Sequence, residues 1–266
     1  MPYEQNDAQK HVRPVKSASA RAGATRKAGS LARVVARIGA IDWARAAAAL
    51  EGEGHARAHG LLTPRECDAL IAMYADDRCF RSRIDMGRHR FGEGDYAYFA
   101  APLPPIIATL RRELYARLAP IATAMARALG QSFEYPPKLA DYTELCHRAG
   151  QTRPTPLLLR YRAGGYSRLH RDLYGTLAFP LQATILLSRP GVDFTGGEFL
   201  LVEDRARQQA RGEAIALEQG EMIFFPVRER PVASGDRQVR AVMRHGVSRI
   251  HAGERYALGI IFHDAA

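Results

Sequence analysis

The segment Tyr161-Arg-Ala-Gly-Gly-Tyr-Ser-Arg-Leu-His170-Arg-Asp172 places a histidine and an aspartate two positions apart in a pattern typical of an extended strand. Side chains two apart on a strand leave the same face, so His170 and Asp172 are expected to point the same way. His245, far downstream, adds a second imidazole. Two imidazoles and one carboxylate can hold a non-haem Fe(II) on one side and leave its other positions open. These three residues are the predicted metal ligands.

The same spacing also occurs by chance in proteins that bind no metal. The prediction therefore depends on what accompanies the pair, namely His245, a downstream arginine and a strand-rich context. His251 and His263 are rival distal ligands. We favour His245 because it lies ten residues before Arg255 on a predicted strand, whereas His251 falls in a predicted turn.

The chain after Thr155 consists of short extended runs separated by Gly, Pro and Asp. The predicted strands are 157–161, 169–173, 181–187, 198–202, 214–217, 222–225, 242–247 and 256–262. Short strands at this spacing are typical of a jelly-roll or a related barrel.

The chain before Thr155 favours helices. Apolar spacing and capping residues predict helices over 31–50, 64–75 and 103–129. Asp42 is expected to divide the first, and Pro120 to kink or break the third. Arginines alternate with aromatic residues over 80–99, which suits contacts with phosphates and bases but equally a plain pair of strands.

These elements together predict an α+β protein with a double-stranded β-helix (jelly-roll) core and N-terminal helices packed on one sheet. One domain would span 31–266, with a helical part at 31–155 and a jelly-roll part at 156–264. Residues 1–30 carry almost no large apolar side chains. They cannot bury enough surface to offset the entropy of ordering, so we expect a disordered basic tail.

The charge is unevenly distributed along the chain. The formal net charge is +10, and residues 1–40 hold eight Lys or Arg against two acidic residues. A basic tail attracts nucleic acid through counterion release, although such tails also serve as plain solubilising segments. Further arginines in predicted loops are expected to border the mouth of the site and contact nucleic acid: Arg205, Arg207, Arg211, Arg228 and Arg230.

Composition also indicates the compartment. No run of about 18 apolar residues and no apolar leader occurs, so we expect no membrane association and no secretion. Three widely spaced cysteines fit reduced thiols better than disulfides or a zinc site. The expected location is the cytoplasm.

The last predicted strand has two different faces. Arg255, Ala257 and Gly259 alternate with Tyr256, Leu258, Ile260 and Phe262. The apolar set is expected to face the core under the helices. On the other face, two very small residues leave room beside Arg255, which suits a bidentate clamp on a carboxylate.

His170-Arg-Asp172, His245 and Arg255 together resemble the ligand pattern of Fe(II)- and 2-oxoglutarate-dependent dioxygenases with a prolyl-hydroxylase-like arrangement. Longer motifs resemble a bacterial family of such oxygenases described as acting on alkylated nucleic acid. They are His-Arg-Asp-Leu-Tyr-Gly (170–175), Leu-Leu-Ser-Arg-Pro-Gly (186–191), Asp-Phe-Thr-Gly-Gly-Glu-Phe (193–199), Met-Arg-His-Gly-Val-Ser-Arg (243–249) and Leu-Gly-Ile-Ile-Phe-His-Asp (258–264). The resemblance covers residues 40–264.

The resemblance implies that His170, Asp172 and His245 ligate Fe(II) and that Arg255 binds the distal carboxylate of 2-oxoglutarate. Tyr161 is a candidate hydroxyl donor to the same carboxylate. The implied cosubstrates are 2-oxoglutarate and O2, and the implied products are succinate and a hydroxylated substrate. On an N-methyl group that product would break down to formaldehyde and the free base, which is a DNA repair reaction.

Two other functions remain open at this stage. The spacing of Arg255 after His245 is that of prolyl hydroxylases, so the enzyme could hydroxylate a protein side chain. From a different class, the barrel could be a metal-free, cupin-like binding module.

Overall fold

The computed structural model describes the backbone of residues 17–266 and the side chains of residues 28–266. It contains helices and antiparallel sheets, which confirms the mixed composition predicted from the sequence. The helices are α1 (Ser17–Gly39), α2 (Trp43–Gly52), α3 (Pro64–Met73), α4 (Pro105–Ala128) and α5 (Leu139–Arg148), with short 3₁₀ turns η1 (Asp77–Cys79) and η2 (Gly87–His89).

The helix boundaries follow the predicted capping residues. The Asp42 carboxylate accepts a hydrogen bond from the Arg45 amide at the start of α2, so the 31–50 segment is divided as expected. Thr63 and Glu66 form a reciprocal capping box at the start of α3. Pro120 lies inside α4 without ending it, so the predicted break does not occur there.

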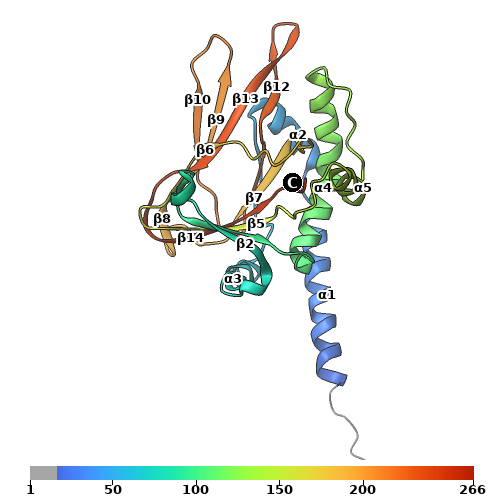
Figure 1. The fold of residues 1–266 in the computed structure, drawn as a ribbon, viewed down its shortest axis with the longest axis vertical. Helices are drawn as coiled ribbons and strands as arrows, with labels where there is room; N and C mark the ends of the chain where they lie inside the picture. The colour runs from blue at the N-terminus through green and yellow to red at the C-terminus, as the bar shows by residue number, and fades with distance from the viewer. Residues whose placement is uncertain (1–16) are drawn as a thin grey trace, which may run out of the picture.

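The predicted disorder of residues 1–30 is wrong for residues 17–30, which form the first part of α1. The prediction considered only the lack of apolar surface to bury. The same residues include five alanines, two arginines and one lysine, which have high helix propensity. Residues 1–16 lie outside the described residues. Figure 1 shows α1 extending away from the body of the protein.

The larger sheet has the strand order β1-β11-β7-β14-β5-β4-β2, with β8 paired to β14. Its strands are β1 (Ala56–Ala58), β2 (Phe80–Asp85), β4 (Asp95–Phe99), β5 (Leu157–Arg162), β7 (Leu181–Leu186), β8 (Phe194–Gly196), β11 (Met222–Pro226) and β14 (Ile250–Ile260). Within the 80–99 segment, β2 and β4 thus lie at the edge of this sheet.

The smaller sheet has the order β10-β9-β13-β6-β3, with β12 paired to β13. Its strands are β3 (Gly92–Glu93), β6 (Tyr166–His170), β9 (Phe199–Arg205), β10 (Arg211–Ile215), β12 (Glu229–Ser234) and β13 (Arg237–Val247). Several strand boundaries differ from the predicted ones, and β8 and β12 were not predicted. Strand β6 ends at His170 instead of continuing to 173, and β12 forms where a loop was expected.

The chain packs in layers, and the helices cover the outer face of the larger sheet (Figure 1). The outer core joins helical residues such as Leu114 to strand residues such as Ile185 and Phe224. A second core lies on the inner side and includes Phe199, Phe225 and other residues of both sheets. Strand β14 separates the two environments as predicted, with Leu258, Ile260 and Phe262 in the outer core.

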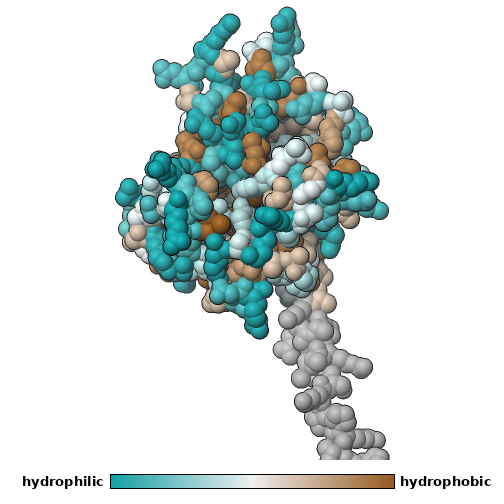
Figure 2. Space-filling view, in the orientation of Figure 1, coloured by the Kyte–Doolittle hydropathy of each residue, from teal (hydrophilic) through white to brown (hydrophobic). Residues whose placement is uncertain are grey.

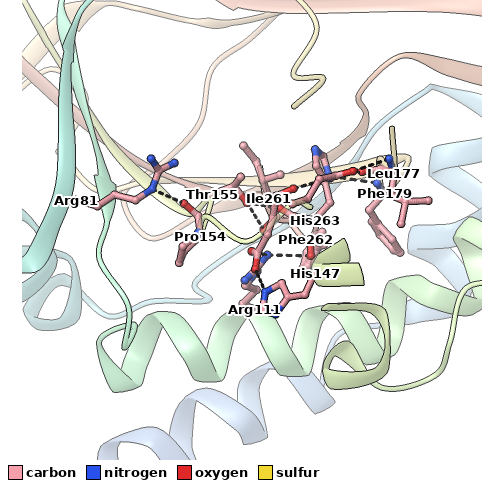
Figure 3. A network of polar contacts seen from close by, with 12 residues as sticks. Arg81, Arg111, His147, Pro154, Thr155, Leu177, Phe179, Ile261, Phe262 and His263 are labelled. Carbon is pink, nitrogen blue, oxygen red and sulfur yellow. Dashed lines mark hydrogen bonds and ion pairs between the residues drawn. The ribbon is translucent and has the colours of Figure 1, made fainter. Parts of the chain in front are cut away.

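Polar contacts fasten the segment after β14 to the helices (Figure 3). The buried Arg111 guanidinium of α4 donates to the carbonyl oxygens of Ile261 and Phe262, at 2.9 Å each, and to the Asp264 carboxylate at 2.7 Å. His147 of α5 lies 2.9 Å from the other Asp264 oxygen. The buried Asp264 carboxylate gives the buried Arg111 guanidinium an anionic partner.

The face shown in Figure 2 is mostly hydrophilic, with small apolar patches between polar areas. Among the described residues, no helix combines the length and apolar character needed to cross a membrane.

Candidate metal centre and cosubstrate cavity

The structure brings His170, Asp172 and His245 together. One ligand atom from each lies within 4.8 Å of the other two. The Nε2 atom of His170 is 3.4 Å from one Asp172 oxygen, and the Nε2 atom of His245 is 3.4 Å from the other. Two imidazole nitrogens and a carboxylate thus converge on one point, which is a donor set that a divalent metal ion can occupy.

Strand pairing sets the distance between the two imidazoles. His245 on β13 is the direct cross-strand partner of His170 on β6, and their ring centroids are 4.3 Å apart. The His245 ring is buried between Phe199 and Phe225. Nδ1 of His170 lies 2.8 Å from the Arg168 carbonyl oxygen, which can only accept. That nitrogen therefore carries a proton, so Nε2 is the His170 nitrogen that is available to a metal.

Asp172 lies beyond the end of β6, so its position does not come from strand alternation as predicted. The Tyr174 hydroxyl donates to Asp172 Oδ1 at 2.7 Å. Tyr174 packs edge-on against Tyr98, which packs edge-on against Tyr96. Sequence reasoning did not single out Tyr174, and its position two residues after Asp172 was the only available signal.

The charges of this cluster stabilise one another. Burial raises the pKa of Asp172, but hydrogen bonds and charges from the two imidazoles outweigh burial and hold that pKa well below its usual range. Burial tends to lower the pKa of His170, yet Asp172 raises it overall. For His245, burial dominates and lowers the pKa. An ionised carboxylate beside a neutral His245 is the state that a metal ligand requires.

Arg255 and Tyr161 form a second cross-strand pair on the larger sheet. They are direct partners in the β14–β5 pairing, and both are 1% exposed. The Arg255 guanidinium carbon lies 5.8 Å from the centre of the Tyr161 ring. Burial raises the pKa of Tyr161 to about 12, so its hydroxyl remains a proton donor at neutral pH.

The Arg255 guanidinium has buried nitrogens that form no hydrogen bond within the described part of the chain. Its Nε and Nη1 atoms are buried and have no hydrogen-bond partner among the described residues. Burial lowers its pKa to about 10, which still leaves it charged at neutral pH. Gly197 approaches its side chain so closely that an added Cβ would lie 2.9 Å from Arg255 Cδ. A buried, charged guanidinium whose nitrogens have no partner among the described residues can bind the carboxylate of an anion.

One cavity of about 350 Å³ contains both groups of residues. Ala257 and Gly259 line it beside Arg255, as the strand pattern predicted. Gln182 and Thr184 of β7 also line it, and the buried Gln182 Oε1 has no partner among the described residues. Sequence reasoning missed both, although polar residues alternating with Leu181, Ala183 and Ile185 were the signal that could have found them.

The cavity mouth carries arginines together with exposed apolar side chains. Arg90, Arg168 and Arg171 line the cavity and are exposed, and none forms an ion pair within the described part of the chain. Three lining residues are large, apolar and exposed: Phe91 (51%), Leu169 (38%) and Leu173 (40%). Apolar surface gathered at one opening is typical of a binding site.

The arginines predicted to border the mouth do not line this cavity. Arg230 is 1% exposed and binds Glu203, which also pairs with Arg205. Arg211 begins β10 and donates to the Glu53 carbonyl oxygen, whereas Arg228 lies beside Glu229. Arg207 is exposed in the turn between β9 and β10. The prediction placed residues of β9, β10 and β12 in loops. It also could not anticipate that the buried Glu203 pairs with Arg205 and Arg230.

The rival histidines lie elsewhere. His251 is exposed on β14, beside Gly196, and not in the predicted turn. His263 is fully buried, and its Nδ1 accepts a hydrogen bond from the Phe179 amide. Neither joins the ligand cluster.

Residues 94–265 match the model of the Oxygenase-NA family, described as "Oxygenase, catalysing oxidative methylation of damaged DNA". The chain belongs to this family. Uncharacterized protein Rv2227 of Mycobacterium tuberculosis is 49% identical to it over 168 residues, which are 63% of this chain and 72% of that protein. As a member of an oxygenase family, the protein is an enzyme, and the non-enzymatic binding module is ruled out.

Two solved structures align with this chain. A 2OG-Fe(II) oxygenase family oxidoreductase from Burkholderia pseudomallei aligns with a TM-score of 0.52 at 18% identity, over 85% of this chain and 94% of that one. A Pseudomonas putida prolyl-4-hydroxylase aligns with a TM-score of 0.47 at 15% identity, over 84% and 99%. The first of these alignments shows that the two chains share a fold.

Proposed function

We propose that this enzyme oxidatively demethylates or hydroxylates alkylated nucleic acid. In this proposal His170, Asp172 and His245 hold Fe(II), Arg255 binds the distal carboxylate of 2-oxoglutarate, and Tyr161 adds a hydroxyl donor. The observation that carries the proposal is one cavity that combines the converging ligand atoms with a buried, unpartnered guanidinium.

When held by these residues, Fe(II) would allow 2-oxoglutarate and O2 to hydroxylate a C–H bond, with 2-oxoglutarate converted to succinate and CO2. The protein residues position the cosubstrate and shield the cavity from water. Arg255 offers two adjacent donors to a carboxylate, and its burial strengthens the charge pairing. Leu157, Leu159 and Phe199 line the cavity with apolar surface, which limits the access of water.

We also propose an architecture for the protein. The two antiparallel sheets, with one predicted ligand group on each, support a double-stranded β-helix within a single domain spanning 31–266.

A nucleic-acid substrate is supported by the description of the family and by the three arginines at the mouth. Exposed guanidiniums without acidic partners are free to contact phosphates. An N-methylated base presented to the cavity would be hydroxylated on its methyl group, and the product would break down to formaldehyde and the free base.

The test measures succinate and formaldehyde from the full chain with Fe(II), 2-oxoglutarate and a methylated single-stranded oligonucleotide. Turnover should fall in the variants Arg90→Ala, Arg168→Ala and Arg171→Ala and persist in Arg207→Ala, an exposed arginine away from the cavity. Turnover on peptides, with none on a panel of alkylated oligonucleotides, would instead favour the protein side-chain hydroxylase that the spacing of His245 and Arg255 also allows.

A further inference from the structure

Phe91 is a large apolar side chain that the fold leaves half exposed at the cavity mouth. It follows η2 and precedes β3, and it lines the cavity with 51% of its surface exposed. Exposing a phenyl ring forgoes the stabilisation that burial would provide. A ring in this position is available for contact with a molecule that binds at the cavity mouth.

The backbone holds Phe91 in a defined place. Its amide donates to the carbonyl oxygen of the buried Met86 at 3.0 Å, and its carbonyl oxygen accepts from the Arg168 amide at 2.9 Å. Arg90, just before it, adopts a left-handed conformation with φ of 60°. Two backbone bonds to different elements and a tight turn keep the ring at the rim.

The ring already takes part in one stack. The His89 imidazole lies nearly parallel to it, at 19°, with ring centroids 5.4 Å apart. This stack orients the phenyl ring and still leaves half of its surface exposed. A flat, oriented and exposed aromatic surface suits another flat ring.

The charges beside Phe91 indicate which kind of molecule would bind at the cavity mouth. Arg90 precedes it, and Arg168 is hydrogen-bonded to it through the backbone. Both are exposed and line the same cavity, as does Arg171. Positive side chains that flank an aromatic platform match a strand of alternating bases and phosphates.

We propose that Phe91 stacks on an unpaired base of a single-stranded nucleic acid, next to the nucleotide that enters the cavity, while Arg90, Arg168 and Arg171 contact its phosphates. This inference rests on the proposed function and adds to it the form of the substrate. A base pair inside a duplex offers no free face for stacking, so the enzyme should favour single strands over duplexes.

Binding of fluorescent oligonucleotides to the full chain, followed by anisotropy, tests this without turnover. The probes are a single-stranded oligothymidine, an abasic strand of the same length, and a duplex. Phe91→Ala should weaken oligothymidine binding about tenfold, the loss of one base stack, and leave abasic binding unchanged. Phe91→Trp should restore affinity, and Val192→Ala, which removes a 70% exposed side chain outside the cavity lining, should change nothing.

The arginines should behave differently from Phe91. Arg168→Ala should weaken binding of both single strands and reduce the slope of log affinity against log salt by about 0.7, the expected value for one lost phosphate contact. A stacking residue should leave that slope unchanged. Thermal melting of each variant verifies that the fold is intact.

The outcomes separate this inference from the proposed function. Equal loss of oligothymidine and abasic binding in Phe91→Ala, or a preference for duplex, overturns the stacking role even if methylated oligonucleotides are turned over. If the unmodified protein binds no oligonucleotide and turns over only peptides, both proposals fail and the rim binds a peptide.

Discussion

At the scale of single residues, the candidate metal centre depends on a hydrogen bond that no spacing rule predicts. Asp172 lies after the end of β6, and Tyr174 holds one of its oxygens. That bond leaves the other oxygen 3.4 Å from His245. Residues that hold a metal ligand in this way orient it and raise metal affinity.

Tyr174→Phe removes this hydrogen bond while keeping the ring. We expect metal affinity to fall about tenfold or more, because the Asp172 carboxylate loses its orientation. Calorimetric titration with Mn(II), in the absence of turnover, measures the change. Tyr256→Phe, which alters a tyrosine on the outer core side of β14, serves as the control. Unchanged Mn(II) affinity in Tyr174→Phe would show that the bond is only structural.

Arg255→Gln removes the buried guanidinium. We expect the affinity for 2-oxoglutarate to fall about a hundredfold, since loss of one partner of a buried charge pair costs about 2–5 kcal/mol. The unliganded protein should melt no lower than the original, because Nε and Nη1 of Arg255 have no partners among the described residues. Equilibrium binding measures the affinity for 2-oxoglutarate, and thermal melting measures the stability of the unliganded protein. A large loss of stability with unchanged binding would contradict the anion-binding role.

At the scale of secondary-structure elements, the register of β6 and β13 positions the imidazoles. A slip of one residue would turn the His245 side chain to the opposite face. Gly246 keeps the strands close, since a Cβ there would lie 2.8 Å from the Ser167 carbonyl oxygen. The same logic places Arg255 opposite Tyr161 in the β14–β5 pair.

Helix α4 holds the end of the sheet through Arg111. Arg111→Met should reduce the free energy of unfolding by about 3–5 kcal/mol, because it leaves the buried Asp264 carboxylate without its main partner. Urea denaturation measures the loss. Arg112→Met, at a position 58% exposed and paired with the adjacent Glu113, should change stability by less than about 1 kcal/mol. Similar losses in both variants would rule out a special role for the buried pair.

At the scale of the whole molecule, stability should depend on pH through His263. Burial, and then Arg111, lower its pKa from 6.5 to about 4, against the opposing effects of Asp172 and Asp264. Between these pH values the unfolded chain binds the proton more readily than the folded protein. Stability is therefore fully present above pH 6.5 and is lost as the pH falls towards 4, by at most about 3 kcal/mol.

His263→Gln should flatten this dependence, because glutamine can accept the Phe179 hydrogen bond without titrating. Urea denaturation at several pH values between 4 and 7 measures the slope of the free energy of unfolding against pH. His89→Gln alters an exposed histidine and should leave the slope as it was. A slope that is identical in His263→Gln would assign the acid sensitivity to other groups.

Much of the candidate site could be predicted because its signals are local. The spacing of His170 and Asp172, and the alternation of Arg255, Ala257 and Gly259 with larger apolar residues, are visible within a few positions. The structure places these residues in one cavity, as expected. Their roles as ligands stay predictions. The basic residues could not be assigned in this way, because Arg90 and Arg230 look alike in sequence, yet one is exposed at the mouth and the other is buried against Glu203.

The sequence by itself determined the mixed helical and strand composition, the starts of α2 and α3, and the two faces of β14, because capping and periodicity depend only on neighbouring residues. The tertiary structure alone decided that Tyr174 holds Asp172 and that Phe91 lies exposed at the mouth of the cavity. The reason is that strand register and the packing of the two sheets bring together residues far apart in the chain, and no local pattern specifies which partners will meet.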